Sequence, residues 1–191
     1  MPQFLRSHAR IPALTTLSKE THTKYMIALE ISDIKECMSH LLIKNTFDRF
    51  QFVNGSITTF NTFQIDGYIH KEFYDSDELA ALLPGQEYSF WRDLRTYCLS
   101  LIKGKKTPLE FHLTFSLSPK GIESIIQKEN LPFTPAQVQG LYLNFRYQQK
   151  KLTCVTGTSF KGFLMDKSLE HIWDHMAQIF FRQHGITAAP M

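Results

Sequence analysis

The chain has 191 residues, of which 43% are apolar, 20% charged and 13% aromatic, and it contains only three cysteines. This composition excludes collagen, coiled coils, low-complexity disorder and disulfide-stabilised scaffolds, and the length predicts a single folded domain. Residues 1–25 hold four basic side chains and one acidic side chain, so they account for the formal net charge of +3. The remainder is neutral, with 17 basic and 17 acidic side chains. It therefore lacks the overall positive charge that is typical of nucleic-acid-binding domains.

Residues 1–25 are rich in Ser and Thr and lack the continuous apolar stretch of a secretory signal. We expect a disordered leader, a transit peptide or a translation start placed too far upstream, with Met26 as the natural start. The cysteines share no CxxC spacing, and no apolar run reaches the roughly 18 residues of a membrane span. We therefore expect a cytoplasmic protein without a membrane partner, a metal or a cofactor.

The first predicted elements are a strand over 26–31 and a helix over 34–42. In the helix, apolar residues recur at the i, i+3, i+4, i+7 spacing of one buried face. Asp33 stands where a helix cap is needed, and Glu36 follows three residues later, so the pair predicts a capping box.

The next segment is predicted to form short strands. Asn54-Gly55 follows a strand and is the strongest short signal for a hairpin turn, because both residues tolerate positive φ. The return strand is then expected over 57–65 and a third strand over 68–74. A short helix over 76–83 is closed by a Pro-Gly pair.

The middle of the chain contains one ambiguous and two clear segments. Residues 91–103 fit either a helix or a strand, because their apolar positions satisfy both periods. Strict alternation over 109–117 predicts a strand with one buried face. Ser118-Pro119 supplies a cap and a first-turn proline for the helix that follows.

The last predicted elements are a second hairpin, over 138–147 and 152–160 with its turn at 148–150, and a helix over 166–182. We expect residues 183–191 to form a flexible tail, which leaves a single domain over 26–182.

The order strand, helix, hairpin therefore occurs twice, at 26–65 and at 109–160. This order predicts an α+β fold in which helices pack on one face of a largely antiparallel sheet. The arrangement is also similar to one domain of a DNA sliding clamp, and this likeness concerns topology alone.

One sequence pattern suggests a metal site on the last helix. His171, Asp174 and His175 read His-x-x-Asp-His, close to an inverted zincin signature. At helical spacing both histidines project away from the apolar face, and no later helix could supply a third ligand. We therefore expect a solvated pair of histidines and no metal.

Two groups of basic residues are the strongest candidates for a binding site. The first runs from Arg92 to Thr107 and contains Arg95, Lys103, Gly104, Lys105, Lys106 and Thr107. The second contains Arg146, Lys150, Lys151 and Lys161, with no acidic residue between its ends. If the groups meet in space they could hold phosphate oxygens, whereas the alternative is solvated, lysine-rich turns. The first group is not a phosphate loop, because its leading glycine is replaced by Leu99.

These residues favour a non-enzymatic module that recognises a protein or nucleic-acid partner through the loops at 103–108 and 156–162. The alternative is an enzyme that acts on a phosphorylated small molecule. In that case Lys105 and Lys106 would hold the phosphate, and Asp66 or Asp166 would act as the base.

Several segments carry a family resemblance, which extends over about 26–181. They read SITTFNTFQIDG at 56–67, LIKGKKTP at 101–108, TGTS at 156–159 and DKSL at 166–169, followed by Trp173-Asp174. In these segments the chain resembles an uncharacterised family of small bacterial proteins, one of the families of unknown function. The resemblance implies a cytoplasmic bacterial protein and supplies no activity.

Overall fold

The computed structural model describes residues 26–162 and 166–191, so the expected leader lies outside the described residues. The described residues form seven strands: β1 (Ala28–Ile31), β2 (Gln51–Thr58), β3 (Thr62–Asp66), β4 (Glu110–Ser116), β5 (Val138–Gln148), β6 (Lys151–Phe160) and β7 (Ala188–Pro190). They also form the helices α1 (Ile34–Leu42), α2 (Ser76–Ala81), α3 (Trp91–Ile102), α4 (Pro119–Lys128) and α5 (Ser168–Gln183), with short 3-10 turns η1 (Lys71–Phe73) and η2 (Pro135–Gln137).

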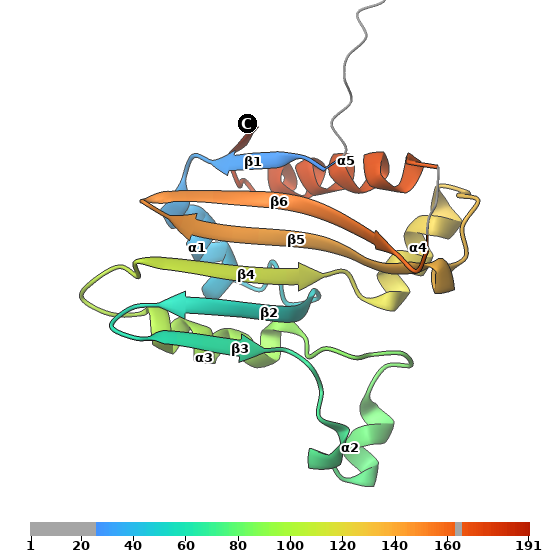
Figure 1. Cartoon of the computed structure of the whole chain (residues 1–191), viewed down its shortest axis with the longest axis horizontal. Coiled ribbons are helices and arrows are strands. Elements are labelled where there is room, and N and C mark those ends of the chain that lie inside the picture. The colour runs from blue at the N-terminus through green and yellow to red at the C-terminus, as the bar shows by residue number, and fades with distance from the viewer. Residues whose placement is uncertain (1–25, 163–165) are drawn as a thin grey trace, which may run out of the picture.

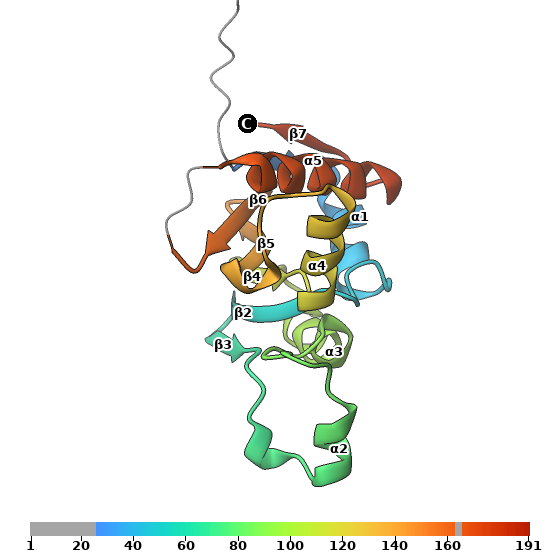
Figure 2. The same ribbon diagram turned by 90° about the vertical axis from the view of Figure 1, so that its right-hand side faces the viewer.

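All seven strands join one antiparallel sheet in the order β3-β2-β4-β5-β6-β1-β7 (Figure 1). Helices α1, α3, α4 and α5 pack on one face of it, while the segment containing η1 and α2 extends beyond β3 (Figure 2). The predicted α+β architecture, with helices on a single face of an antiparallel sheet, is therefore confirmed.

The two predicted strand-helix-hairpin units are nested in the sheet. Strands β4, β5 and β6 of the second unit are neighbours, whereas β1 of the first unit lies beyond β6 and pairs with it instead of with β2. The second unit thus separates β1 from the β2–β3 hairpin. The element order repeats along the chain, but the spatial arrangement does not.

The core lies between the sheet and the helices. Alternate strand residues face it, as periodicity predicts, and aromatic rings dominate it: Phe47 stacks on Phe115, and Phe145 meets both rings edge-on. Trp91 of α3 is buried against Phe52, and its indole N–H donates to the Leu41 carbonyl. Burying such rings dominates the hydrophobic stabilisation of a domain of this size.

The opposite side of the sheet, called the open face below, carries mostly polar side chains. No helix in the described residues covers it (Figure 2). Cross-strand pairing aligns its residues in rows, of which two matter below: Gln51, Ser116, Tyr142 and Gly157; and Ser56, His112, Arg146 and Thr153.

The hairpin predicted at Asn54-Gly55 is wrong, because β2 continues through both residues. The turn lies at 59–61, where the Thr59 N–H donates to the Asn61 carbonyl. Glycine is needed at position 55 for a different reason: a Cβ there would lie 2.7 Å from the His112 carbonyl oxygen of β4. A close approach between strands can thus produce the same dipeptide as a turn.

The strand predicted over 68–74 is also wrong. Only Tyr68 forms an isolated bridge, with Tyr88, and the 3-10 turn η1 follows. The alternating pattern predicted a strand that does not form, because the chain leaves the sheet after Gly67. The Gly67 N–H donates to the Val53 carbonyl at this point. Residues 91–102 form helix α3, which resolves the ambiguity in favour of the helix.

The flexible tail expected over 183–191 is contradicted by the structure. Gly185 adopts positive φ after α5 and reverses the chain, Ile186 is 3% exposed, and Ala188–Pro190 pairs with β1 as strand β7. A three-residue edge strand is too short to show a period, so its pairing could not be read from the sequence.

Candidate binding groove

A groove of about 860 Å³ lies between α1, the C-terminal half of α3 and the loop at 103–108. This feature is called the basic groove below. Five of the predicted site residues line it: Lys103, Gly104, Lys105, Lys106 and Thr107. Its apolar lining comes from Ile34, Met38, Leu42, Ile43, Leu99, Ile102, Pro108, Phe111 and Tyr147. The structure therefore places the central part of the predicted site beside an apolar cavity of ligand-binding size.

The loop at 103–108 is fixed at both ends by backbone hydrogen bonds. The Lys103 N–H donates to the Leu99 carbonyl at the end of α3 (2.7 Å), and the Leu109 N–H donates to the Thr58 carbonyl of β2 (2.8 Å). These anchors hold three lysines within a short span along one lip of the groove.

The floor of the groove is aromatic. Phe111 of β4 and Tyr147 of β5 are cross-strand partners whose rings stack at 5.3 Å with an angle of 15°. Phe111 is buried and Tyr147 is partly exposed, so the floor presents the phenol ring to an incoming group. Such a pair buries apolar area and stabilises the sheet at this edge of the core.

The acidic residues of the basic groove are already compensated. The Asp33 carboxylate accepts from the Glu36 N–H (2.9 Å) and caps α1, as predicted. The Glu36 carboxylate does not complete the predicted capping box. Instead it pairs with the Lys44 ammonium, which holds the pKa of Glu36 below its usual value.

Lys103, Lys105 and Lys106, by contrast, form no ion pair with any residue that the structure describes. The groove therefore presents a surplus of positive charge above an apolar floor.

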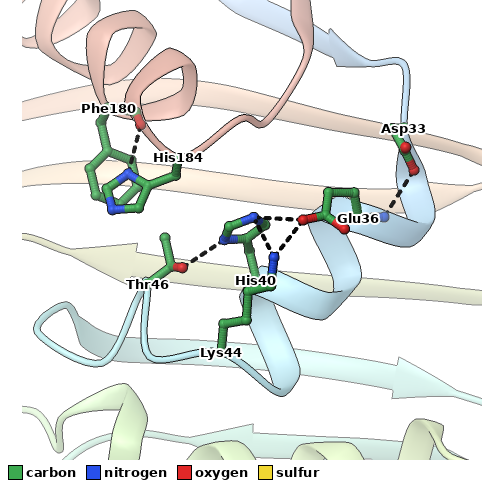
Figure 3. A network of polar contacts seen from close by, with 7 residues as sticks. All are labelled: Asp33, Glu36, His40, Lys44, Thr46, Phe180 and His184. Carbon is green, nitrogen blue, oxygen red and sulfur yellow. Dashed lines mark hydrogen bonds and ion pairs between the residues drawn. The ribbon is translucent and has the colours of Figure 1, made fainter.

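A polar network joins α1 to the neighbouring loop, and its central ring also contacts His184 at the end of α5 (Figure 3). His40 is 5% exposed; one ring nitrogen lies 2.7 Å from the Thr46 hydroxyl and the other 3.1 Å from the Glu36 carboxylate. Its ring also meets His184 edge-on at 6.3 Å. Burial, together with the Lys44 charge, lowers the pKa of His40, so the imidazole is neutral near pH 7. The network holds the wall of the groove in place.

Arg95, a predicted site residue, has a structural role instead. Its guanidinium donates to the carbonyl oxygens of Ile43 and Lys44 and lies 3.5 Å from the Asp48 carboxylate. Because Ile43 and Lys44 follow the last residue of α1, Leu42, no N–H of the helix is available to their carbonyls, and the guanidinium supplies the donors instead. Arg95 therefore ties α3 to the end of α1 and does not line the groove.

Arg146 and Lys161, the two site candidates from the second predicted basic group, lie outside the basic groove. Arg146 lies on the open face of β5, two residues from the end of the sheet that carries the groove. Lys161 follows β6 at the opposite end, where its N–H donates to the Gln137 carbonyl. Their separation follows from the antiparallel β5–β6 pairing, which places residues 146 and 161 far apart along the strands.

The acids proposed for an enzyme lie away from the groove. Asp66 ends β3 and accepts from the Tyr68 N–H, and Asp166 precedes α5 and accepts from the Ser168 N–H. The Ser168 hydrogen bonds lower the pKa of Asp166, which weakens it as a base. Neither carboxylate lines the cavity that holds Lys105 and Lys106.

The three cysteines are buried, and the two histidines predicted to be solvated lie on the surface of α5. Cys37, Cys98 and Cys154 are free and buried, and burial raises the pKa of Cys37 and of Cys98 to about 12. Thiols held neutral in this way are poor nucleophiles. His171 and His175 are exposed as predicted, and no group of three metal-ligating side chains occurs in the described part of the chain.

Sequence reasoning missed the apolar half of the groove. Phe111, Ile34 and Met38 carry the same helical and alternating periods as the core residues. Periodicity identifies a buried side chain but does not tell whether another segment or a cavity lies beside it. These residues differ from the rest of the core only because they line the cavity between α1 and the C-terminal half of α3.

No helix in the described residues combines the length and apolar character that a transmembrane span requires. Residues 40–188 match the model of a family described as a family of unknown function, DUF5721. The match covers most of the chain and confirms the predicted resemblance to a family of unknown function. No curated protein and no solved structure matches the chain.

Proposed function

The chain belongs to DUF5721, a family of unknown function, and we propose that it is a non-enzymatic binding module that holds an acidic protein segment in the basic groove. The observation that carries this proposal is the combination of an apolar floor with three uncompensated lysines on one lip. Apolar side chains of the partner would fill the floor, and its carboxylates would meet the lip.

A protein segment suits this groove better than a nucleic acid does. Nucleic-acid sites combine a basic stripe with exposed aromatic rings on which bases stack. Here seven of the nine apolar lining residues are aliphatic, Phe111 is buried, and Tyr147 is the single partly exposed ring among them. In addition, residues 26–191 carry no surplus charge. Amphipathic segments, in contrast, bind grooves through apolar anchors at regular spacing.

We place this module in a reducing cytoplasm. All three cysteines are free, buried and distant from one another in the sequence, which suits a compartment where disulfides do not persist.

Selection from a random peptide library against the full chain tests the proposal. We expect the enriched sequences to alternate acidic and apolar residues. A Lys103/Lys105/Lys106→Ala variant should bind the enriched peptide at least about tenfold more weakly, because surface charges steer and retain an acidic partner. The wild-type affinity should also fall as salt is raised.

A Lys71/Lys120/Lys128→Ala variant is the matched control, because it removes the same charge at exposed lysines outside the groove. Equal losses in both variants would contradict a local site. Single- and double-stranded oligonucleotides form the other arm of the experiment. Binding of either, abolished by the groove variant and not by the control, would overturn the choice of a protein partner.

A further inference from the structure

A second cavity, of about 400 Å³, lies at the end of the sheet opposite the basic groove, where β5 begins and β6 ends. We call it the tyrosine pocket. Its floor includes Gln51, Ser116 and Tyr142, which form one cross-strand row on the open face. Tyr88 and the first turn of α4 form walls, and the charged residues Glu87 and Lys161 also line it. The pocket shares no residue with the basic groove.

Gln51 supplies the first sign that the tyrosine pocket is built for a ligand. Its side chain is 4% exposed and lines the cavity, yet its Nε2 has no hydrogen-bond partner among the described residues. A buried amide without a partner is costly, and native proteins keep few of them. A ligand acceptor at this position would complete the site.

Tyr142 supplies the second sign, because glycine at position 140 lets its ring lie flat along β5. A Cβ at Gly140 would be 2.3 Å from the Tyr142 hydroxyl. Burial raises the pKa of Tyr142 and that of Tyr88, so both phenols keep their protons at neutral pH. Neither hydroxyl forms a hydrogen bond within the described structure. Three donors, two hydroxyls and one amide, therefore line one cavity.

The surrounding charges indicate what these donors would hold. Helix α4 begins at the pocket, where Pro119 and Ile122 line it, so the positive end of the helix dipole adds to the charge of Lys161. Donors, a helix N-terminus and an ammonium together suit a carboxylate. Glu87 then offers the opposite charge for an amine on the same ligand.

Apolar side chains complete the lining and would accept an aliphatic group. They are Leu117, Pro119, Ile122, Pro135 and Val138.

We propose that the tyrosine pocket binds a free aliphatic α-amino acid, with its carboxylate toward Gln51, Tyr142 and Lys161 and its ammonium toward Glu87. The inference does not depend on the function proposed for the basic groove, because the two sites lie at opposite ends of the sheet.

Thermal unfolding and isothermal titration calorimetry of the full chain test this proposal with L-leucine, L-isoleucine and L-methionine as probes. A ligand selective for the folded state must raise the melting temperature, and we expect a rise of several degrees at saturation. L-Leucine amide, which lacks the carboxylate, and 4-methylpentanoate, which lacks the ammonium, should each bind at least about tenfold more weakly, because each loses a charge-assisted contact.

Gln51→Leu is the decisive variant, because it removes the unpartnered amide and should fold at least as stably as the parent. We expect it and Tyr142→Phe to lose about tenfold or more in amino-acid affinity. Tyr97→Phe, at an exposed tyrosine of α3 that lines neither cavity, is the matched control and should bind the probes as the parent does.

Three results would overturn the proposal. The first is the absence of any shift with the amino acids at millimolar concentration, with water alone beside Gln51 in a crystal structure. The second is equal binding of L-leucine and its amide. The third is preferential binding of a sugar or a nucleoside, which would assign the donors to another ligand class.

Discussion

Asp174 illustrates how this fold holds a charged side chain inside its core. The residue lies on the buried side of α5, although the sequence places it between two exposed histidines. Its carboxylate accepts a hydrogen bond from the Thr156 hydroxyl of β6, which in turn accepts from the Ile27 N–H. The side chain therefore ties α5 to the sheet next to β1.

Burial raises the pKa of Asp174 above its usual value, while the hydrogen bond from Thr156 opposes the shift. The folded chain thus binds this proton more tightly than the unfolded chain, so the stability due to this group falls as pH rises between the two pKa values. Asp174→Asn should remove that fall, and Asp174→Ala should cost about 1–3 kcal/mol because the buried Thr156 hydroxyl loses its carboxylate acceptor.

Urea unfolding at a series of pH values from about 3 to 7 measures both effects of the Asp174 substitutions. The difference in unfolding free energy between Asp174→Asn and the parent should grow in favour of the variant as pH rises. A difference that is independent of pH, or that grows in favour of the parent, would contradict the assignment.

At the scale of elements, the C-terminal segment is part of the packed structure. Ile186 joins the core cluster, and β7 pairs with β1, which would otherwise be an edge strand. We expect Ile186→Ala to lower the unfolding free energy by about 2–4 kcal/mol, the usual cost of truncating a buried isoleucine. Met191→Ala, at a residue 68% exposed, is the control and should change little. Equal, small effects in a denaturation experiment would indicate that the segment does not pack.

Local signals in the sequence predicted some elements of the fold correctly and failed at others. Helices α1 and α4 were predictable, because local caps and a 3.6-residue period agree at Asp33 and Ser118. The turn at 148–150 was also predictable, and Gln149 and Lys150 adopt the positive φ values that a tight hairpin needs. The hairpin turn predicted at Asn54-Gly55 was wrong, because the glycine is required by the close approach of β4, a strand more than fifty residues away in the sequence.

The candidate sites were predictable only in part. The lysines at 103–106 were found because charge clusters are visible along the chain. Gln51, Tyr88 and Tyr142 were not, because isolated polar residues in separate elements carry no shared pattern. Cross-strand register brings Gln51 and Tyr142 into one row, and register is a property of the sheet.

At the scale of the whole molecule, nesting of the two units makes each depend on the other. Strand β1 pairs with β6 and β7 only, so residues 26–66 contain no three-stranded sheet of their own. We expect the peptide 26–66 to be unfolded by circular dichroism, since an isolated hairpin is marginal in water. The full chain should melt in a single transition. A cooperative melt of the peptide alone would contradict this interdependence.

The three buried free thiols make it possible to follow local unfolding of the chain by chemical labelling. Cys37 lies on α1, Cys98 on α3 and Cys154 on β6, so together they sample both helical walls of the groove and an interior strand of the sheet. An alkylating reagent can reach them only when the surrounding layer opens. The order in which the three are labelled under mild denaturant would therefore show which part of the domain opens first, without any engineered probe.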